Sequence, residues 1–318
     1  MFLRLLAPRV FSVHTWNERQ HLLAFLRRFR RVFLQDQGDV VVDFTNTRVM
    51  EAPGTLLFMA ELDRGLRMAK SAQRVTCKLP SSDCHEAELV REVLHQIGAL
   101  DLLGYDTSHL CSDDYHETVR HWRYATGTRV DETPGDLLEH SEGRVAEALM
   151  KGMHVGVAEA ITNSLHHAYG ASRDDGCGHF SERRWWMFTA EQNGMLEVVV
   201  CDLGIGIRRS LPMKWPKSMI GKIFKALERR DLDTASIQLA LVIGETSTGE
   251  DNRGRGLPQI WNAIRMASVG LIHIMSDKGF VGYNADGQSE QHTQYRGSIH
   301  GTLISWKVPI DVAAVADG

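Results

Sequence analysis

Residues 159–167 read Glu-Ala-Ile-Thr-Asn-Ser-Leu-His-His, and this stretch decides the fold prediction. Glu159, Asn163 and His167 stand four residues apart, so in a helix their side chains lie along one face. The apolar residues around this column predict a largely buried helix; they are Val155, Val157, Ile161 and Leu165. A buried carboxylate, amide and imidazole lose hydration unless a partner binds them. A Mg²⁺-nucleotide is one such partner, and hydrogen bonds inside the protein are the other explanation.

A second informative stretch, residues 196–206, reads Leu-Glu-Val-Val-Val-Cys-Asp-Leu-Gly-Ile-Gly. The β-branched run predicts a buried strand, and Asn193-Gly194 before it predicts a hairpin that pairs the strand back onto residues 184–190. The strand ends in the pattern Asp-x-Gly-x-Gly, formed by Asp202, Gly204 and Gly206. Glycines allow the backbone to approach a flat ligand while the carboxylate accepts a hydrogen bond from it. A strand-exit turn without a ligand has the same pattern.

A third stretch, residues 253–258, reads Arg-Gly-Arg-Gly-Leu-Pro and precedes a helical pattern through Ile260, Ile264 and Met266. Free backbone N–H groups at such a helix start can bind phosphate, aided by the helix dipole. Pro258 suits the first helical turn, where its missing N–H costs nothing. A glycine-rich loop without a ligand is the alternative. The three stretches together, in this order, are far more specific than any one of them.

This ordered set, followed by Gly301-Thr302 at the start of a late strand, resembles the GHKL ATP-binding fold, named for gyrase, heat-shock chaperone, histidine kinase and MutL members. The string from Ala158 to Tyr169 is most similar to the anti-sigma-factor serine kinases of bacterial partner-switching systems. The resemblance covers residues 140–310. It implies ATP and Mg²⁺ as ligands and a two-layer α/β sandwich with a long ATP lid.

The resemblance also implies a role for each matching position. Glu159 is implied as the general base or water-orienting carboxylate, Asn163 as the Mg²⁺ ligand, and Asp202 as the acceptor for the adenine amino group. The other implied nucleotide-binding residues are Gly204 and Gly206 at the adenine, Gly254, Arg255, Gly256 and Leu257 at the phosphates, Thr302 beside Asp202, and His167 near the phosphates. For His167, a histidine satisfied inside the fold is the alternative. Phosphoryl transfer depends mainly on positioning and charge neutralisation, so no larger catalytic cluster is required.

The N-terminal part, residues 1–126, predicts a small α/β domain with a connector. Strands are expected at residues 39–44 and 74–79, and helices at residues 56–66 and 86–103. The strand that leads through Ala52-Pro53-Gly54 into a helix is similar to STAS domains, the usual partners of anti-sigma kinases. Phosphorylatable members have a serine just before the glycine, where this chain has Ala52 and Pro53. A structural or docking role is therefore predicted rather than a phosphoswitch.

The C-terminal GHKL-like domain is predicted to span residues 136–312, with the ATP lid at about residues 207–254. Residues 104–140 are interpreted as a connector with a strand near residues 122–125, and Thr133-Pro134-Gly135 as a turn at the domain boundary. The lid carries a basic helical pattern at residues 217–230, and residues 25–33 form another basic helix. A protein partner is expected for such a surface, a nucleic acid is the weaker partner, and a solvated surface helix without a partner is the alternative.

Composition limits the class of protein. The chain has 318 residues, 43% of them hydrophobic, and a net charge of −4, which suits two globular domains and argues against a general polyanion binder. Its five cysteines show no C-x-x-C pair, which argues against a disulfide framework and predicts a reducing cytoplasm. No apolar run reaches membrane-spanning length, so no membrane association is expected.

Three functions remain open for an ATP site of this kind. The first, which the long lid and the missing STAS serine favour, is a slow ATPase switch that controls contacts with a partner or a second copy in a homodimer. The second is a serine/threonine protein kinase that acts as an anti-sigma-like regulator. The third is a nucleotide sensor that binds ATP or ADP without turnover. A histidine kinase is not expected, because no dimerising helix hairpin with an acceptor histidine precedes the site.

Overall fold

The computed structural model describes residues 2–69, 74–81, 84–107, 115–214, 221, 232–246 and 256–310. Two compact units make up the chain. The first unit comprises residues 1–124, 175–180 and 188–193, and the second comprises residues 125–174, 181–187 and 194–318. The protein is an α+β chain with both parallel and antiparallel sheets, as the sequence predicts. Among the described residues, no helix is both long and apolar enough to cross a membrane.

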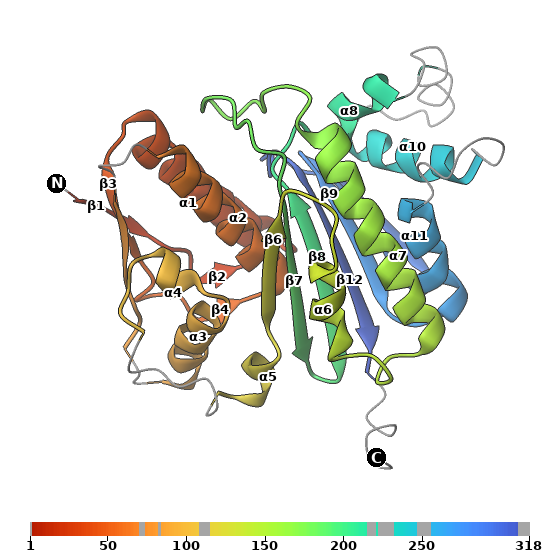
Figure 1. Ribbon diagram of the computed structural model, residues 1–318, viewed down its shortest axis with the longest axis horizontal. Coiled ribbons are helices and arrows are strands. Elements are labelled where there is room, and N and C mark those ends of the chain that lie inside the picture. The colour runs from red at the N-terminus through yellow and green to blue at the C-terminus, as the bar shows by residue number, and fades with distance from the viewer. Residues whose placement is uncertain are drawn as a thin grey trace. The chain divides into compact units, whose positions relative to one another are not determined.

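The first unit is built on a parallel sheet in the order β1-β3-β5 (Figure 1). Its strands are β1 (Phe2–Leu6), β3 (Asp39–Asp43) and β5 (Val75–Lys78), and β2 (Val10–Phe11) pairs separately with β4 (Val49–Met50). Its helices are α1 (Trp16–Arg30), the π-helical turn η1 (Arg31–Gln35), α2 (Ala52–Met68), α3 (His85–Gln96), α4 (Ala99–Leu102) and α5 (Glu117–Arg120). The predicted strands and the helix after Pro53-Gly54 are thereby confirmed.

The predicted single helix over residues 86–103 is wrong, because Gly98 divides it into α3 and α4. Gly98 has φ +71°, a left-handed conformation that a helix interior excludes and that glycine adopts at little cost. The bend lets both helices bury apolar side chains in the first unit: Val90, Leu94, Ala99 and Leu100 are all at most 1% exposed.

A buried ion network joins separate parts of the first unit. Arg30 of α1 donates to Glu61 of α2 at 2.7 Å, and the Arg64 guanidinium lies 3.6 Å from the same carboxylate. Arg64 also donates to Asp175 at 2.8 Å, and Asp175 in turn accepts from the backbone N–H of Cys177 at 2.9 Å. Buried charges are tolerated only when they are paired in this way. Residues 175–180 are therefore held among helices that precede them by more than a hundred positions.

The second unit is built on a sheet in the order β11-β10-β9-β12-β8-β7-β6. Its strands are β6 (Arg123–Gly127), β7 (Trp185–Gln192), β8 (Met195–Asp202), β9 (Leu271–Ser276), β10 (Gly279–Asn284), β11 (Ser289–Gln294) and β12 (Thr302–Pro309). Residues 123–124 of β6 and 188–192 of β7 are counted with the first unit. Its helices are α6 (Thr133–Glu139), α7 (Glu147–Asn163) with the π-helical turn η3 (Ser164–Ala168), α8 (Gly206–Lys214), α10 (Leu232–Thr246) and α11 (Gly256–Ala267).

The predicted hairpin between β7 and β8 is confirmed. Asn193 and Gly194 have φ values of 53° and 70°, the left-handed pair that a two-residue hairpin turn requires. The strand at residues 196–202 then continues into the centre of the sheet, where β12 pairs antiparallel with both β8 and β9.

Helices α7, α10 and α11 pack on one face of this sheet, and Figure 1 shows α7 and α11 side by side across it. The core between helices and sheet holds side chains that alternate along the strands, as on any half-buried sheet. Val198, Ile272 and Trp306, which are cross-strand neighbours, are all fully buried there. The predicted burial of the helix at residues 155–167 holds for Val157, Ile161 and Leu165, whereas Val155 is 36% exposed and faces away from the core.

Two interpretations of loops are corrected. The strand predicted near residues 122–125 is confirmed as β6, but residues 104–140 also contain the helices α5 and α6, so they are more than a connector. Thr133-Pro134-Gly135 is the first turn of α6 rather than a boundary turn, because proline fits a helix start and Leu138 needs the helix to enter the core.

The predicted lid at residues 207–254 contains two packed helices among its described residues. Helix α8 begins it, and α10 buries Ala235, Ile237 and Leu239 completely. Helix α10 extends to Thr246, well into the predicted lid. The basic pattern at residues 217–230 lies outside the described residues, apart from Gly221.

Candidate functional site

The polar column of the sequence lies at the C-terminal end of α7. Glu159 and Asn163 are in the last turns of α7, His167 is in η3, and all three side chains are half-buried. Ser164 bonds its hydroxyl back to the carbonyl of Ala160 at 2.8 Å, a contact that bends helices and accompanies the change to π-helical geometry here. Single π-helical turns are rare and often occur at functional sites. The column therefore ends in an irregular turn rather than in a plain helix.

The end of this turn contacts the Asp-x-Gly-x-Gly segment after β8. The backbone N–H of Ile205 donates to the carbonyl of Ala168 at 2.8 Å, and the N–H of Leu203 donates to the Tyr169 hydroxyl at 3.2 Å. Tyr169 is buried and donates its own proton to the carbonyl of Arg184. Burial, followed by the charge of Asp202, raises the pKa of Tyr169 well above its usual value, so the hydroxyl stays protonated. The polar helix and the glycine-bearing strand end are thus side by side.

Asp202 occupies the last position of β8, directly across from Thr302, the first residue of β12. Its side chain accepts a hydrogen bond from the N–H of Gly204 at 2.9 Å, and Thr302 contributes a backbone and a side-chain hydrogen bond. Burial raises the pKa of Asp202 to about 6, although these hydrogen bonds and the charge of Arg173 act in the opposite direction. The carboxylate is held as an oriented acceptor that ionises near neutral pH.

Gly204 and Gly206 are needed by the chain itself. A Cβ at Gly204 would overlap the carbonyl of Ala168, and a Cβ at Gly206 would overlap the carboxylate of Asp277. Gly206 also has φ +74°, which L side chains rarely adopt. Close approach of neighbouring segments explains both glycines without a ligand. An adenine-lining role stays a prediction beside this structural one.

Asp277 is a titratable group at this edge of the sheet that the sequence did not indicate. It lies in the turn between β9 and β10, and its carboxylate accepts from the Ser298 hydroxyl at 3.1 Å. Burial raises the pKa of Asp277 to about 7, with Asp233 and Asp202 adding to the rise while Ser298 and Arg209 oppose it. The nearby Ser276 hydroxyl accepts from the N–H of Ile207 at 2.8 Å. The sequence Asp277-Lys278-Gly279 predicts the hairpin turn that carries Asp277, but it gives no sign that Gly206 lies beside this turn.

The residues predicted at the phosphates are only partly described. Gly254 and Arg255 lie outside the described residues, as does Arg253. Gly256 and Leu257 form the start of α11, as predicted for a helix N-terminus, and α11 packs directly on α7. The helix that carries Glu159 and the helix that begins at Gly256 are therefore neighbours.

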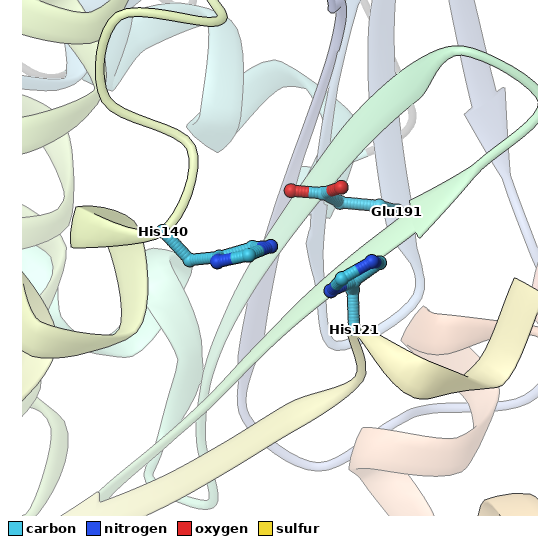
Figure 2. Close-up of side chains that lie close together, drawn as sticks. All are labelled: His121, His140 and Glu191. Carbon is cyan, nitrogen blue, oxygen red and sulfur yellow. The ribbon is translucent and has the colours of Figure 1, made fainter. Parts of the chain in front are cut away.

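A pair of titratable side chains lies elsewhere, in the first unit. Figure 2 shows His121, at the end of α5, beside Glu191 of β7, with ligand atoms within 4.8 Å of one another. His140, also labelled there, belongs to the second unit. Structural and catalytic zinc sites take three or four protein ligands. The two residues of the first unit are too few for such a site.

The end of β8 offers Asp202 as a buried acceptor and the hydroxyl groups of Thr302 and Ser276. The half-buried polar column lies on the neighbouring helix; it consists of Glu159, Asn163 and His167. This set can bind a ligand that donates a hydrogen bond at one end and carries a metal or phosphate at the other. No protein-family model matches the sequence, and comparisons with curated proteins and with solved structures find no significant match.

Proposed function

We propose that the second unit binds ATP with Mg²⁺ in the manner of the GHKL class and works as a slow ATPase switch. One observation carries the proposal. The turn after Asp202 is hydrogen-bonded to the end of the helix that bears Glu159 and Asn163, through Ile205 and Ala168 at 2.8 Å. Groups suited to a purine base and groups suited to a metal-bound phosphate are thereby neighbours on adjoining elements. Two of the three sequence patterns for ATP binding lie on these elements, and the third leads into α11, which packs on α7.

The base end of the proposed site rests on Asp202 and Thr302. An ionised carboxylate in a buried position accepts a hydrogen bond more strongly than in water. The adenine amino group is a suitable donor, and Thr302 adds a hydroxyl at the same level of the sheet. Helix α8 follows immediately, and Arg208 in it lies 3.5 Å from Asp233.

The residues at the other end fit a Mg²⁺ ion. Asn163 offers a half-buried amide oxygen, and Mg²⁺ takes oxygen ligands from few protein groups while keeping its waters and phosphate oxygens. When bound, the ion neutralises charge on the phosphates. Glu159, one helical turn earlier, is proposed to orient the attacking water and to accept its proton. Phosphate groups are proposed to lie at the start of α11, near Gly256.

The first unit is proposed as a STAS-like docking unit. Its parallel β1-β3-β5 sheet and the helix that begins at Ala52-Pro53-Gly54 agree with that resemblance. Thr55, the hydroxyl residue closest to the family's serine position, is fully buried, so we assign it no modification. A partner protein or a second copy of the chain is the proposed target of the switch.

Transfer of phosphate to a protein is the second candidate, because the string from Ala158 to Tyr169 is similar to serine kinases. Incubation of the purified chain with γ-labelled ATP, alone and with candidate partner proteins, distinguishes the functions. Release of free phosphate supports the ATPase, a labelled protein supports the kinase, and binding without either product supports a sensor.

Replacement of Asn163 by alanine is expected to remove the Mg²⁺-dependent part of ATP binding, because the amide oxygen is the proposed metal ligand. Calorimetric titration with ATP in the presence of Mg²⁺ and of a chelator measures this part directly. Thr162→Ala, which changes an adjacent hydroxyl that bonds to the carbonyl of Ala158 at 2.8 Å, is the matched control. An Asn163→Ala variant with the wild-type response to Mg²⁺ would remove the metal role.

ATP affinity is expected to decrease as the pH falls through about 6, the pKa of Asp202. The ionised carboxylate accepts more strongly from the adenine amino group than the protonated form does, so affinity should be near its maximum above pH 7 and should decline progressively between pH 7 and pH 5. Calorimetry between pH 5.5 and 8 measures the profile. Asp202→Asn is expected to bind ATP more weakly and to keep only the pH dependence that comes from the ATP phosphates. Asp277→Asn shows how much of the pH profile comes from the neighbouring carboxyl group of Asp277. Identical profiles for wild type and Asp202→Asn would contradict the assignment.

A further inference from the structure

Arg173 is a buried cation close to the proposed base end of the site. It lies in the loop after η3, is 8% exposed, and donates from Nη1 to the carbonyl of His300 at 2.9 Å. A buried guanidinium is costly unless acceptors and negative charge surround it. Neither the GHKL-like motifs nor the spacing of the polar column includes this residue.

The carbonyl that Arg173 binds belongs to the turn that delivers Thr302 to Asp202. His300 has φ 54°, a left-handed conformation that few residues other than glycine adopt, although histidine is enriched among them. A Cβ at Gly301 would overlap the backbone carbonyl of Asp202, so the turn passes directly over the end of β8. Arg173 therefore fixes a sharp turn whose position sets the distance between Thr302 and Asp202.

The loop that carries Arg173 is itself held on its other sides. Arg209 of α8 donates to the carbonyl of Ser172 at 3.1 Å, and Tyr169 accepts from Leu203 at 3.2 Å. The loop thus links η3, the start of α8 and the His300 turn. A guanidinium in this position is oriented by packing rather than free to swing into solvent.

The charges around Asp202 come from several elements. Asp277, from the turn after β9, is a second acid that interacts with Asp202, and Asp233 of α10 interacts with Asp277. Arg173 is the cation that lowers the pKa of Asp202, against the larger effect of burial. Arg209 acts on Asp277. Loss of Arg173 would leave Asp202 with the acidic neighbour and without its cation.

We infer that Arg173 is a positioning and specificity-determining residue of the nucleotide site. Arg173 fixes the His300 turn against Asp202 and keeps the Asp202 side chain a hydrogen-bond acceptor. The site therefore takes a purine nucleotide with an exocyclic amino group. The inference rests on the proposed function. It adds a residue whose effect is on the choice of base rather than on phosphate chemistry.

The test compares ATP with inosine triphosphate, in which a carbonyl oxygen replaces the amino group. An ionised Asp202 accepts from the amino group and repels the carbonyl oxygen, whereas a protonated Asp202 donates to that oxygen. Wild type is expected to prefer ATP at pH 7. Arg173→Gln is expected to lose this preference severalfold at pH 7, because the His300 turn loses its hydrogen bond and Asp202 loses a neighbouring cation, and to regain part of it as the pH rises and Asp202 ionises. Arg173→Lys keeps the charge and is expected to keep most of the preference.

Each outcome of the calorimetric comparison decides a different point. If wild type binds neither nucleotide, the proposed function fails and this inference fails with it. If wild type prefers ATP and Arg173→Gln prefers it equally at pH 7, only the role of Arg173 is overturned. Equal weakening of both nucleotides at every pH identifies a purely structural residue and also overturns it. Should Arg173→Gln not fold, loss of the preference in Arg173→Lys would contradict the charge role.

Discussion

Replacement of Glu159 by glutamine is expected to leave ATP binding in place and to lower the rate of phosphate release by about 10²–10⁴-fold, the usual contribution of a general base. The two side chains have nearly the same size, so the half-buried position on α7 should tolerate the change. The proton acceptor is lost, because an amide cannot take a proton from water at neutral pH. Steady-state phosphate release and ATP binding by calorimetry measure the two quantities separately.

The control for this experiment lies on the same helix. Glu147 is exposed in the first turn of α7, and Glu147→Gln should change neither quantity. Release of phosphate by Glu159→Gln at the wild-type rate would require another base. Loss of ATP binding in Glu159→Gln would instead show that the carboxylate supports the pocket rather than the reaction.

Substitution of Gly204 by alanine is expected to lower the free energy of unfolding by about 3 kcal/mol, at the upper end for an overpacked site. The new Cβ would overlap the carbonyl oxygen and Cβ of Ala168, and backbone atoms cannot turn aside as the end of a side chain can. Urea unfolding followed by circular dichroism measures the change. The result is independent of any nucleotide, so it tests only whether the end of η3 meets the turn after β8.

Gly135→Ala is the matched control for the glycine substitution. A Cβ at Gly135 would have nothing within 4 Å, and the residue lies in α6, where alanine is the better helix former. Its stability should be equal to or slightly above that of the wild type. Equal stability of Gly204→Ala and Gly135→Ala would mean that the end of η3 and the turn after β8 do not touch. The two halves of the proposed site would then not be neighbours.

Local sequence signals predicted the elements that carry this site. Asn193-Gly194 predicts the hairpin because few residue pairs tolerate two left-handed conformations in succession. The β-branched run before Asp202 predicts a buried strand, and the apolar spacing around Glu159 predicts a helix. Each of these features depends on residues close together in the chain, and each is present in the structure.

Features that depend on distant segments could not be predicted. Nothing near Gly206 indicates that Asp277, 71 positions later, fills the space of its missing side chain. Nothing near Arg173 indicates the His300 carbonyl. Gly204 and Gly206 show this difficulty. The sequence indicates that another group approaches the backbone closely at these glycines, but it does not indicate which group does so. The π-helical turn at Ser164–Ala168 was missed for a similar reason, because its sequence is also compatible with a continuous α-helix.

The contact between Arg64 and Asp175 has a consequence for genetic dissection of the chain. A fragment that ends near residue 126 would contain every described helix of the parallel sheet's unit, yet it would lack Asp175, one of the two carboxylates that pair with Arg64, whose side chain is only 1% exposed. Glu61 would then be left to pair with both Arg30 and Arg64, and removal of one partner from a buried ion pair costs several kcal/mol, a large share of the stability of a small domain. Separate expression of the amino-terminal portion therefore calls for a graft of residues 175–180 or for an apolar replacement at position 64.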